Sequence, residues 1–481
     1  MADPAQTTPH VVVVGAGIAG LAAALAVRER SGAEVTVTVL EGSPVVGGKL
    51  ASVEVAGIRV DAGAESMLVR RGEAVGLARA AGLGDHLVHP AVSGASLWSR
   101  GALRPLPSGQ LMGIPGDLRA LAASGALSLP GLARIPLDHL LPRTAVHGDV
   151  SLGSYVAARL GCEVVDRLVE PLLGGVYAGH AAELSLDATL PQLSGAVRVE
   201  RSLLRAVGQA LGRTPVTARQ PVFAGLRGGV GSLPAAVAAA SGATVRTGSM
   251  VRELRRSPGG WRLVVGPARA PEQLFADAVI LAVPAGPASR LLQAVAAEAA
   301  AELAAIEYAS VALVTFAVPS EQLAAKMPGT GFLVPPVDGR VIKAATFSSR
   351  KWAWQGEASA AAGGLDVLRV SVGRHREVAE LRRDDDDLAA VALAELSLAL
   401  RADLAPVDHV VTRWGGAFPQ YAVGHLDRVA RIRRSVAEQP ALAVCGAAYE
   451  GVGIPACIAS AQAAADRVLQ GLQARRQWSH G

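Results

Sequence analysis

The chain has 481 residues, of which 51% are hydrophobic and 18% charged, with a formal net charge of +5. This length predicts two or more packed domains, and the apolar fraction excludes a disordered or collagen-like chain. Only four of the 46 basic residues are lysine, so arginine carries almost all of the positive charge. Because arginines and acids are interspersed, the pattern predicts no nucleic-acid-binding surface.

The three cysteines, Cys162, Cys445 and Cys457, form no CxxC pair. Their spacing argues against a zinc site or a disulfide framework and favours a reducing compartment, with the cytoplasm as the default location. Residues 11–27 run without a charge for nearly the length of a membrane-spanning helix. Glycines interrupt this run and no lysine or arginine precedes it, so we predict a strand, a turn and a helix instead of a span or a signal peptide.

The start of the chain has the pattern of a dinucleotide site. Four valines over 11–14 predict a strand buried in a parallel sheet, and a GxGxxG turn and an Ala/Leu-rich helix over 21–30 follow. A second strand over 35–40 delivers an acid at its end. The glycines let the backbone approach a pyrophosphate, the helix terminus supplies N–H groups, and the acid accepts ribose hydroxyls. The candidate cofactor residues here are Gly15, Ala16, Gly17, Ile18, Ala19, Gly20, Glu41 and Gly42.

A second glycine pair follows this acid. Gly47 and Gly48 allow another close backbone approach and Lys49 suits a phosphate, although a plain turn is the alternative for these residues alone. Glu41 followed by Gly47-Gly48-Lys49 resembles the motif shared by FAD-dependent amine oxidases, carotenoid desaturases and protoporphyrinogen oxidases. The resemblance implies FAD in preference to NAD, with Gly48 and Lys49 at the cofactor.

Two further segments gain a cofactor role from this resemblance. Residues 61–66 follow a short predicted strand where the superfamily closes its isoalloxazine site, which implicates Gly63, Ala64, Glu65 and Ser66. Porphyrinogen oxidases usually have Gly-Pro-Asp-Ser or a similar sequence there, so this chain departs from the usual turn but keeps the glycine, acid and serine. Val251 stands where these flavoenzymes lend backbone hydrogen bonds to adenine, although the bare sequence shows only a strand valine.

Residues 105–215 predict an inserted, mainly helical region, because prolines punctuate short apolar helices such as 118–127. Its apolar segments have three readings, a cover for a substrate cleft, a membrane-surface contact or buried core, and buried core is favoured. Within it, residues 170–179 (EPLLGGVYAG) and 184–186 resemble a segment of bacterial porphyrinogen oxidases of the Gram-positive type. This match narrows the family more than the nucleotide motifs do.

Residues 300–410 alternate β-rich runs with loops and one helix over 388–400, which predicts the antiparallel sheet of a substrate domain. Four acids over 384–387 directly precede that helix. A metal site is one interpretation, but acids in this position more often cap the helix and complement its dipole, so we predict a cap. His375, between two arginines, is predicted to lie at the surface and not to act in catalysis.

The carboxyl-terminal part again resembles the porphyrinogen oxidases. Trp414 lies on a predicted strand before Pro419-Gln420-Tyr421, as in that family. A buried strand over 441–445 then leads through a glycine turn to a helix over 456–469. By resemblance this is the closing flavin element, whose backbone donors face the flavin pyrimidine, where negative charge gathers on reduction. It adds Trp414, Val452, Gly453 and Ile454 to the candidate cofactor residues.

Together these patterns predict an α/β fold, α+β overall, of the amine-oxidase flavoprotein type. It comprises a discontinuous Rossmann-like FAD-binding domain, a mixed-sheet substrate domain and an inserted helical domain. We assign residues 1–90, 216–298 and 408–481 to the FAD-binding domain, 91–110 and 299–407 to the substrate domain, and 111–215 to the helical domain, which is also the candidate membrane-surface contact.

The resemblance implies a protoporphyrinogen/coproporphyrinogen oxidase of haem biosynthesis. Such an enzyme removes six electrons from a porphyrinogen with FAD and oxygen, and releases hydrogen peroxide. No nucleophile triad, paired carboxylate site or metal cluster stands out in the sequence, so we identify no catalytic acid or base and no metal site. Three alternatives stay open: another FAD oxidase of amines or carotenoids, a non-redox flavin isomerase such as a sugar-nucleotide mutase, and a porphyrin-binding module.

Two observations favour coproporphyrinogen III over protoporphyrinogen IX: the Gram-positive-type segment and the arginine content. Arginine binds carboxylates bidentately. The candidate propionate-binding residues are Arg70, Arg71, Arg350 and Lys351, and a solvated surface role is the alternative for each. The family also implies product transfer to a ferrochelatase-type partner. The charge pattern predicts no nucleic-acid partner, and the apolar segments of the helical region predict at most peripheral contact with the inner face of a membrane.

Overall fold

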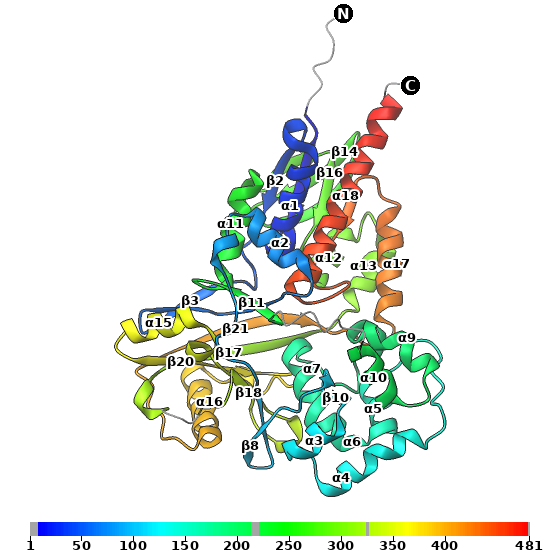
Figure 1. The fold of residues 1–481 in the computed structure, drawn as a ribbon. Coiled ribbons are helices and arrows are strands. Elements are labelled where there is room, and N and C mark those ends of the chain that lie inside the picture. Colours follow the sequence, from blue (N-terminus) through cyan, green and yellow to red (C-terminus); the bar gives the residue numbers. More distant parts are fainter. Residues whose placement is uncertain (1–7, 213–220, 324–326, 480–481) are drawn as a thin grey trace, which may run out of the picture.

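The computed structural model describes residues 8–212, 221–323 and 327–479. Figure 1 shows a parallel sheet with its helices at one end of the molecule, and a mixed, mainly antiparallel sheet beside a helical region at the other end. This arrangement confirms the predicted α/β class with a second, mixed sheet. The domain boundary predicted between 215 and 216 lies outside the described residues.

A five-stranded parallel sheet brings together strands from distant parts of the chain. In spatial order they are β12 (Thr244–Arg246), β2 (Thr36–Leu40), β1 (His10–Val14), β16 (Ala278–Leu281) and β22 (Leu442–Val444). Val11 and Val13 of β1 face one side of this sheet, whereas Val12 and Val14 face the other, and all four are buried. The unbroken valine run therefore reflects burial on both faces.

Different layers cover the two faces of the parallel sheet. The first layer contains α1 (Ile18–Ser31), α2 (Gly72–Ala80), α11 (Leu233–Ser241) and α18 (Ile454–Ser479). The second contains α12 (Ala285–Leu292), α13 (Ala297–Ala304), α17 (His425–Ala437) and a sheet of β13 (Val251–Ser257), β14 (Gly260–Val265) and β15 (Glu272–Ala276). Because both faces are covered, a ligand reaches the backbone of this sheet at its carboxyl edge.

A seven-stranded sheet forms the second body of the fold. In spatial order its strands are β21 (Asp408–Pro419), β17 (Tyr308–Pro319), β20 (Leu365–Val372), β19 (Ile342–Phe347), β18 (Gly331–Leu333), β7 (Ser96–Ser99) and β8 (Ala102–Pro105). The β18–β7 pair is parallel and the other pairs are antiparallel. Helix α16 (Asp385–Leu400) packs on one face of this sheet.

Strand β21 corrects one predicted boundary. It pairs with β17 from Asp408 to Pro419, so residues 408–419 belong to the seven-stranded sheet. The start of the third FAD-domain segment at residue 408 is therefore wrong for these twelve residues. The alternation of a strand reveals its type but not which sheet it joins.

The helical region occupies most of residues 118–212. Its helices are α3 (Leu118–Ser124), α4 (Leu129–Arg134), α5 (Leu152–Leu160), α6 (Cys162–Val164), α7 (Glu170–Tyr177), α8 (Leu186–Thr189), α9 (Pro191–Val199) and α10 (Leu203–Gly212). Their apolar side chains share one core. The helix predicted over 118–127 ends early because Gly125 takes a left-handed conformation, with φ of 64°. Within the described ranges, no helix is both long and apolar enough to cross a membrane.

Short elements complete the fold. They are β3 (Ser52–Val55) with β4 (Ile58–Asp61), β5 (Met67–Leu68) with β11 (Phe223–Leu226) and β6 (Leu87–Val88), β9 (Gln110–Leu111) with β10 (Ile114–Pro115), and the helices α14 (Ser348–Lys351) and α15 (Ala353–Ala361). The helix predicted over 388–400 is confirmed by α16, but the expectation of one helix in residues 300–410 is wrong because α14 and α15 also lie there.

Two side-chain predictions have opposite outcomes. Asp384 caps α16 by accepting a hydrogen bond of 2.8 Å from the backbone N–H of Asp387, which confirms the predicted cap. His375 is only 3% exposed, and its ring Nε2 lies 2.9 Å from the Glu307 carboxylate. The predicted surface position of His375 is therefore wrong, because charged sequence neighbours do not reveal what packs over a residue.

Candidate active site

The glycine turn after β1 lies at the carboxyl edge of the parallel sheet. A Cβ atom on Gly15 would lie 2.6 Å from the Ala282 carbonyl oxygen, and one on Gly20 would lie 1.8 Å from the Gly15 carbonyl oxygen. These two glycines are therefore required by chain packing alone. A Cβ atom on Gly17, the N-cap of α1, would meet nothing within 4 Å. The free space lies in front of a helix N-terminus, where an anion binds favourably.

Glu41, at the end of β2, reaches the same turn. One of its carboxylate oxygens accepts a hydrogen bond of 2.7 Å from the Ala16 N–H, and the other accepts one of 2.8 Å from the Ser43 N–H. Its own backbone oxygen accepts from the N–H of Ser249, two residues before Val251 on β13. The predicted ribose acid and the predicted adenine contact are thus held at neighbouring strand ends.

The second glycine pair packs against the first turn. The Gly47 N–H donates to the Ala16 carbonyl at 2.8 Å, and a Cβ atom on Gly48 would lie 3.4 Å from the Gly17 Cα. Lys49 follows, with its Nζ 5.9 Å from the centre of the Tyr308 ring. Burial lowers the pKa of Lys49. In the part of the chain that the structure describes, no carboxylate forms an ion pair with this cation, so it is available to an anionic ligand.

The loop after β4 joins the two sheets. The Trp414 indole N–H of β21 donates to the Ala62 carbonyl at 2.7 Å, and the Arg369 guanidinium of β20 donates to the Gly63 carbonyl at 2.7 Å. Glu65 forms ion pairs with Arg369 and with Lys351 of α14. Burial alone would raise the pKa of Glu65, but these two cations outweigh it and hold the pKa at about 2. The loop is therefore fixed by charge and backbone contacts.

Asp61, directly before this loop, positions the start of α11. Its carboxylate accepts hydrogen bonds from the N–H groups of Val230 and Gly231, at 3.0 and 2.8 Å. Burial raises the pKa of Asp61 to about 6, although both hydrogen bonds oppose that shift. The segment of residues 230–231, which leads into α11, is thereby tied to β4.

The loop before α18 is held by a buried tyrosine. The Tyr421 hydroxyl donates to the Ala447 carbonyl at 2.7 Å and accepts from the Gly451 N–H at 2.8 Å. His425 stacks on the Tyr421 ring, with ring centres 3.9 Å apart. These contacts hold the loop that leads through Val452 and Gly453 to Ile454, the first residue of α18, so a second helix N-terminus lies at the carboxyl edge of the sheet.

Comparison with known proteins agrees with this geometry. The sequence profile of the flavin containing amine oxidoreductase family matches residues 18–469. The chain belongs to this family. Within it, coproporphyrinogen III oxidase of Bacillus subtilis (strain 168) is 33% identical over 96% of this chain and 98% of that protein. The enzyme of the same name from Mycobacterium leprae is 36% identical over 98% of this chain and 99% of the relative.

A second named enzyme and a solved structure are also similar to this chain over nearly its full length. Bovine protoporphyrinogen oxidase is 32% identical over 95% of this chain and 98% of its own length. The crystal structure of a protein from Exiguobacterium sp. 255-15 matches with a TM-score of 0.83 and 30% identity, covering 97% of this chain and 99% of that one. The predicted protoporphyrinogen/coproporphyrinogen oxidase membership is confirmed.

The residues of the edge fit the flavin that this oxidoreductase family binds. The free space at Gly17, the N-termini of α1 and α18, and the Lys49 cation together favour a ligand with negatively charged phosphates. The turn of residues 15–20, Glu41, the pair Gly47-Gly48 and the loop of residues 62–66 all lie at this edge or pack against its turn. The sequence-predicted cofactor residues are thus brought together.

The predicted substrate residues fare differently. Lys351 pairs with Glu65, so its charge already has a partner. Arg70, Arg71 and Arg350 are exposed, and Arg71 pairs with Glu73 at 3.1 Å. In the described structure, none of these three arginines forms an ion pair or a side-chain hydrogen bond with the loop of residues 62–66. A carboxylate-binding role for them stays a prediction.

Sequence reasoning missed three residues that organise this site: Asp61, Arg369 and Tyr421 as a loop anchor. Asp61 and Arg369 stand in apolar strands, β4 and β20. A charged residue inside an otherwise buried strand is the signal that could have found them, because such a charge requires a partner. Tyr421 belongs to the pattern that resembles the family, whereas its hydroxyl contacts depend on the tertiary structure.

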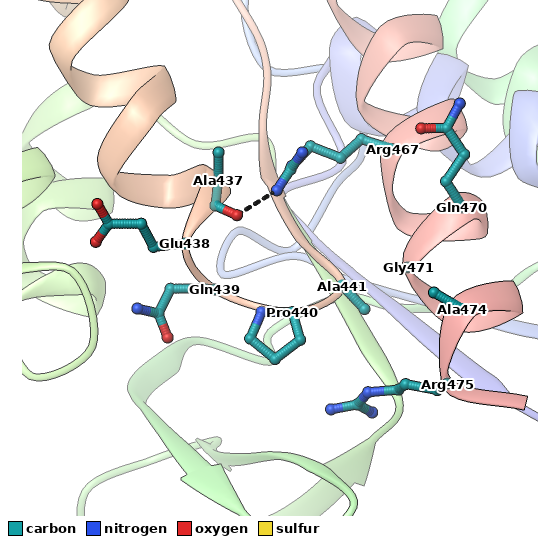
Figure 2. A pocket seen from close by; sticks show the side chains of 10 residues that line it. All are labelled: Ala437, Glu438, Gln439, Pro440, Ala441, Arg467, Gln470, Gly471, Ala474 and Arg475. Carbon is teal, nitrogen blue, oxygen red and sulfur yellow. Dashed lines mark hydrogen bonds between the residues drawn. The ribbon is translucent and has the colours of Figure 1, made fainter. Parts of the chain in front are cut away.

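One pocket lies away from these residues (Figure 2). It has a volume of about 730 Å³ and is lined by Ala437, Glu438, Gln439, Pro440, Ala441, Arg467, Gln470, Gly471, Ala474 and Arg475. Arg467 donates across it to the Ala437 carbonyl at 2.7 Å. The pocket sits where the chain enters β22, which is the amino end of that strand. The candidate cofactor residues lie at the opposite, carboxyl edge of the sheet.

Proposed function

We propose that this chain is an FAD-dependent coproporphyrinogen III oxidase that uses oxygen and releases hydrogen peroxide. The observation that carries the proposal is the end-to-end similarity to relatives named coproporphyrinogen III oxidase, which are 33% and 36% identical in Bacillus subtilis and Mycobacterium leprae. The bovine relative named protoporphyrinogen oxidase is 32% identical over a similar share of the chain. Protoporphyrinogen IX is therefore the competing substrate.

The adenosine half of FAD has a matching set of residues. Glu41 at the end of β2, Val251 at the start of β13 and the Gly17 space lie around the nucleotide edge of the sheet, and this supports a dinucleotide over a flavin mononucleotide. When bound, the flavin supplies the electron-accepting chemistry. The protein groups bind, orient and enclose the flavin, and Lys49 and the two helix N-termini stabilise its negative charge. No acid or base of this chain is assigned to proton transfer.

The proposed substrate surface is the face of the seven-stranded sheet next to the loop of residues 62–66. A buried apolar cluster there contains Ala178, Ala309, Val311 and Ala417, and the partly exposed rings of Trp414 and Phe418 pack against it. Flat aromatic and small aliphatic side chains suit the apolar face of a tetrapyrrole macrocycle. This cluster lies beside Trp414, whose indole holds the loop of residues 62–66.

Two further parts of the proposal concern the setting of the enzyme. Cys445 and Cys457 are free and buried thiols, which supports the predicted reducing, cytoplasmic compartment. Delivery of the porphyrin product to a ferrochelatase-type partner is the last part, and it rests on the family resemblance alone.

Aerobic turnover tests this function. The purified flavoprotein is mixed separately with coproporphyrinogen III, protoporphyrinogen IX and a primary amine, while porphyrin fluorescence and peroxide are recorded. We expect peroxide and porphyrin from coproporphyrinogen III, with a higher kcat/KM than for protoporphyrinogen IX. The reverse preference would reassign the substrate, and oxidation of the amine without any porphyrinogen turnover would overturn the proposal.

A further inference from the structure

Lys343 is a buried cation that the proposed cofactor contacts do not use. It is only 6% exposed, on β19 in the seven-stranded sheet. Its Nζ makes one long hydrogen bond, 3.4 Å, to the Gly174 carbonyl of α7, and lies 5.7 Å from the centre of the Phe418 ring. No carboxylate in the described ranges forms an ion pair with it. A buried ammonium group without an anionic partner is unfavourable, so its presence calls for a ligand.

A β-bulge aims Lys343 away from the core under α16. Ile342 pairs with Val372 and Ala344 pairs with Ser371, so Lys343 is the extra residue on β19. Ile342 packs against α16, whereas the Lys343 side chain reaches α7 and Phe418 on the other face. Strands β20 and β17 separate β19 from β21. The lysine therefore extends across the sheet face that carries the proposed substrate surface.

Unfilled space adjoins the ammonium group. Gly174 is buried, yet a Cβ atom on it would meet nothing within 4 Å apart from the backbone of its own helix. Phe418, the aromatic neighbour of Lys343, packs in the apolar cluster with Trp414. The void and the cation thus lie on the same side of the sheet as the proposed macrocycle surface.

A second buried cation increases the positive charge there. Arg374 is 6% exposed. Its guanidinium adds to the effect of burial in lowering the pKa of Lys343. Its ion-pair partner is Glu377, at 3.4 Å, whose side chain is 48% exposed. Arg369, on the same sheet face, is different because the buried Glu65 carboxylate neutralises it. Arg374 also lies near the Glu170 carboxylate of α7, so the cation without a carboxylate partner in the described ranges is Lys343.

We propose that Lys343, supported by the charge of Arg374, binds a propionate carboxylate of the substrate at the void beside Gly174. The identity of the ligand rests on the proposed function. The class of ligand, an apolar ring that carries a carboxylate, is inferred from the Lys343 cation and from the apolar cluster beside it. Burial lowers the pKa of Lys343 to about 7, and a bound carboxylate would restore the protonated form.

Binding of coproporphyrin III, the tetracarboxylate product, tests this assignment without turnover. Its dissociation constant is measured by fluorescence quenching with the wild-type holoprotein and with Lys343→Met, Lys343→Gln and Lys343→Arg. We expect the two neutral variants to bind about tenfold to a hundredfold more weakly, the loss that follows removal of a hydrogen bond to a charged group. Lys343→Arg should bind nearly as tightly as wild type. The two neutral variants also raise the KM for coproporphyrinogen III and leave kcat unchanged.

Thermal stability separates ligand binding from a structural role. Because Lys343→Met removes an unpaired buried charge, the variant without porphyrin should melt no lower than wild type. Arg255→Met, which removes a cation that is 50% exposed on β13, is the matched control and should change neither property. A lower melting temperature with unchanged affinity would make Lys343 structural and overturn the assignment.

The same data separate the two proposals. Wild-type protein that binds coproporphyrin III but does not oxidise coproporphyrinogen III would overturn the proposed function and leave the carboxylate site standing. Normal oxidation with equal affinity in wild type and both neutral variants would overturn only the carboxylate site. Wild-type protein that neither oxidises coproporphyrinogen III nor binds coproporphyrin III would overturn both.

Discussion

Glycines serve two separate purposes in the turn after β1. Gly15 and Gly20 are needed because a Cβ atom would collide with backbone at 2.6 and 1.8 Å. Gly17 has no such neighbour within 4 Å. The GxGxxG spacing identifies all three positions but does not distinguish their purposes, because the colliding atoms of Ala282 come from a distant segment. Of these three glycines, only Gly17 can therefore be substituted to block ligand binding without a collision inside the protein.

Gly17→Val should abolish flavin retention while the protein still folds, because the branched side chain fills the space in front of α1. The flavin absorbance of the purified protein and its far-UV circular dichroism measure the two effects. Gly76→Val is the matched control, since a Cβ atom on this exposed glycine of α2 also meets nothing within 4 Å. A yellow, fully loaded Gly17→Val protein would show that the pyrophosphate lies elsewhere.

Glu41 shows how far residue-level prediction extends. Its place 21 residues after Gly20 predicts an acid at the end of the second strand, and the structure puts it there. Its hydrogen bonds to the N–H groups of Ala16 and Ser43 were not predictable, because they depend on how the turn folds over the strand end. The contact with ribose remains a prediction.

At the level of elements, α16 follows directly from its sequence. The acids at 384–387 predict a helix start, and the Asp384 side chain caps it while Asp385, Asp386 and Asp387 occupy the first turn. Local signals suffice here because the cap and the N–H group it satisfies are three residues apart. Strand β21 shows the opposite case, because its partner β17 lies about a hundred residues earlier in the chain.

Asp384→Ala should lower the free energy of unfolding by about 0.5–2 kcal/mol, since the Asp387 N–H loses its acceptor. Chemical denaturation measures the change, and flavin content should stay normal because α16 packs on the face of the sheet opposite the proposed site. Asp386→Ala removes a neighbouring acid whose side chain is 95% exposed and should have a smaller effect. A larger loss for Asp386→Ala, or a melting temperature that rises with added divalent cation, would favour the metal interpretation.

Over the whole molecule, Glu65 connects the loop after β4 to the seven-stranded sheet. It follows β4 and pairs with Arg369 of β20 and Lys351 of α14, some 300 residues away. Its side chain is 10% exposed, so the three charges are largely removed from water. Removing one partner of such a cluster leaves buried charge without compensation, which costs more than losing a surface pair.

Glu65→Gln should lower the free energy of unfolding at neutral pH by about 3–5 kcal/mol. Because the pKa of Glu65 is held at about 2, below its usual value, wild-type protein should lose this same contribution as the pH falls from about 4.5 toward 2. Denaturant unfolding across this pH range measures both effects. Glu73→Gln breaks a more exposed pair with Arg71 and serves as the control, with an expected change of at most about 1 kcal/mol. Equal losses in the two variants would contradict the role of Glu65.

The amino-acid sequence by itself determined the strand, glycine turn, helix and acid of the nucleotide motif, the family and the cap of α16. Each of these depends on neighbours within a few residues or on a short motif, and such local relations are written directly in the residue order. The buried position of His375, the Glu65 cluster and the sheet that β21 joins were decided by the tertiary structure. The same holds for Lys343, whose bulge, void and missing partner exist only once α7 covers the sheet. The physical reason is that burial and charge pairing depend on contacts between distant segments, which no local pattern encodes.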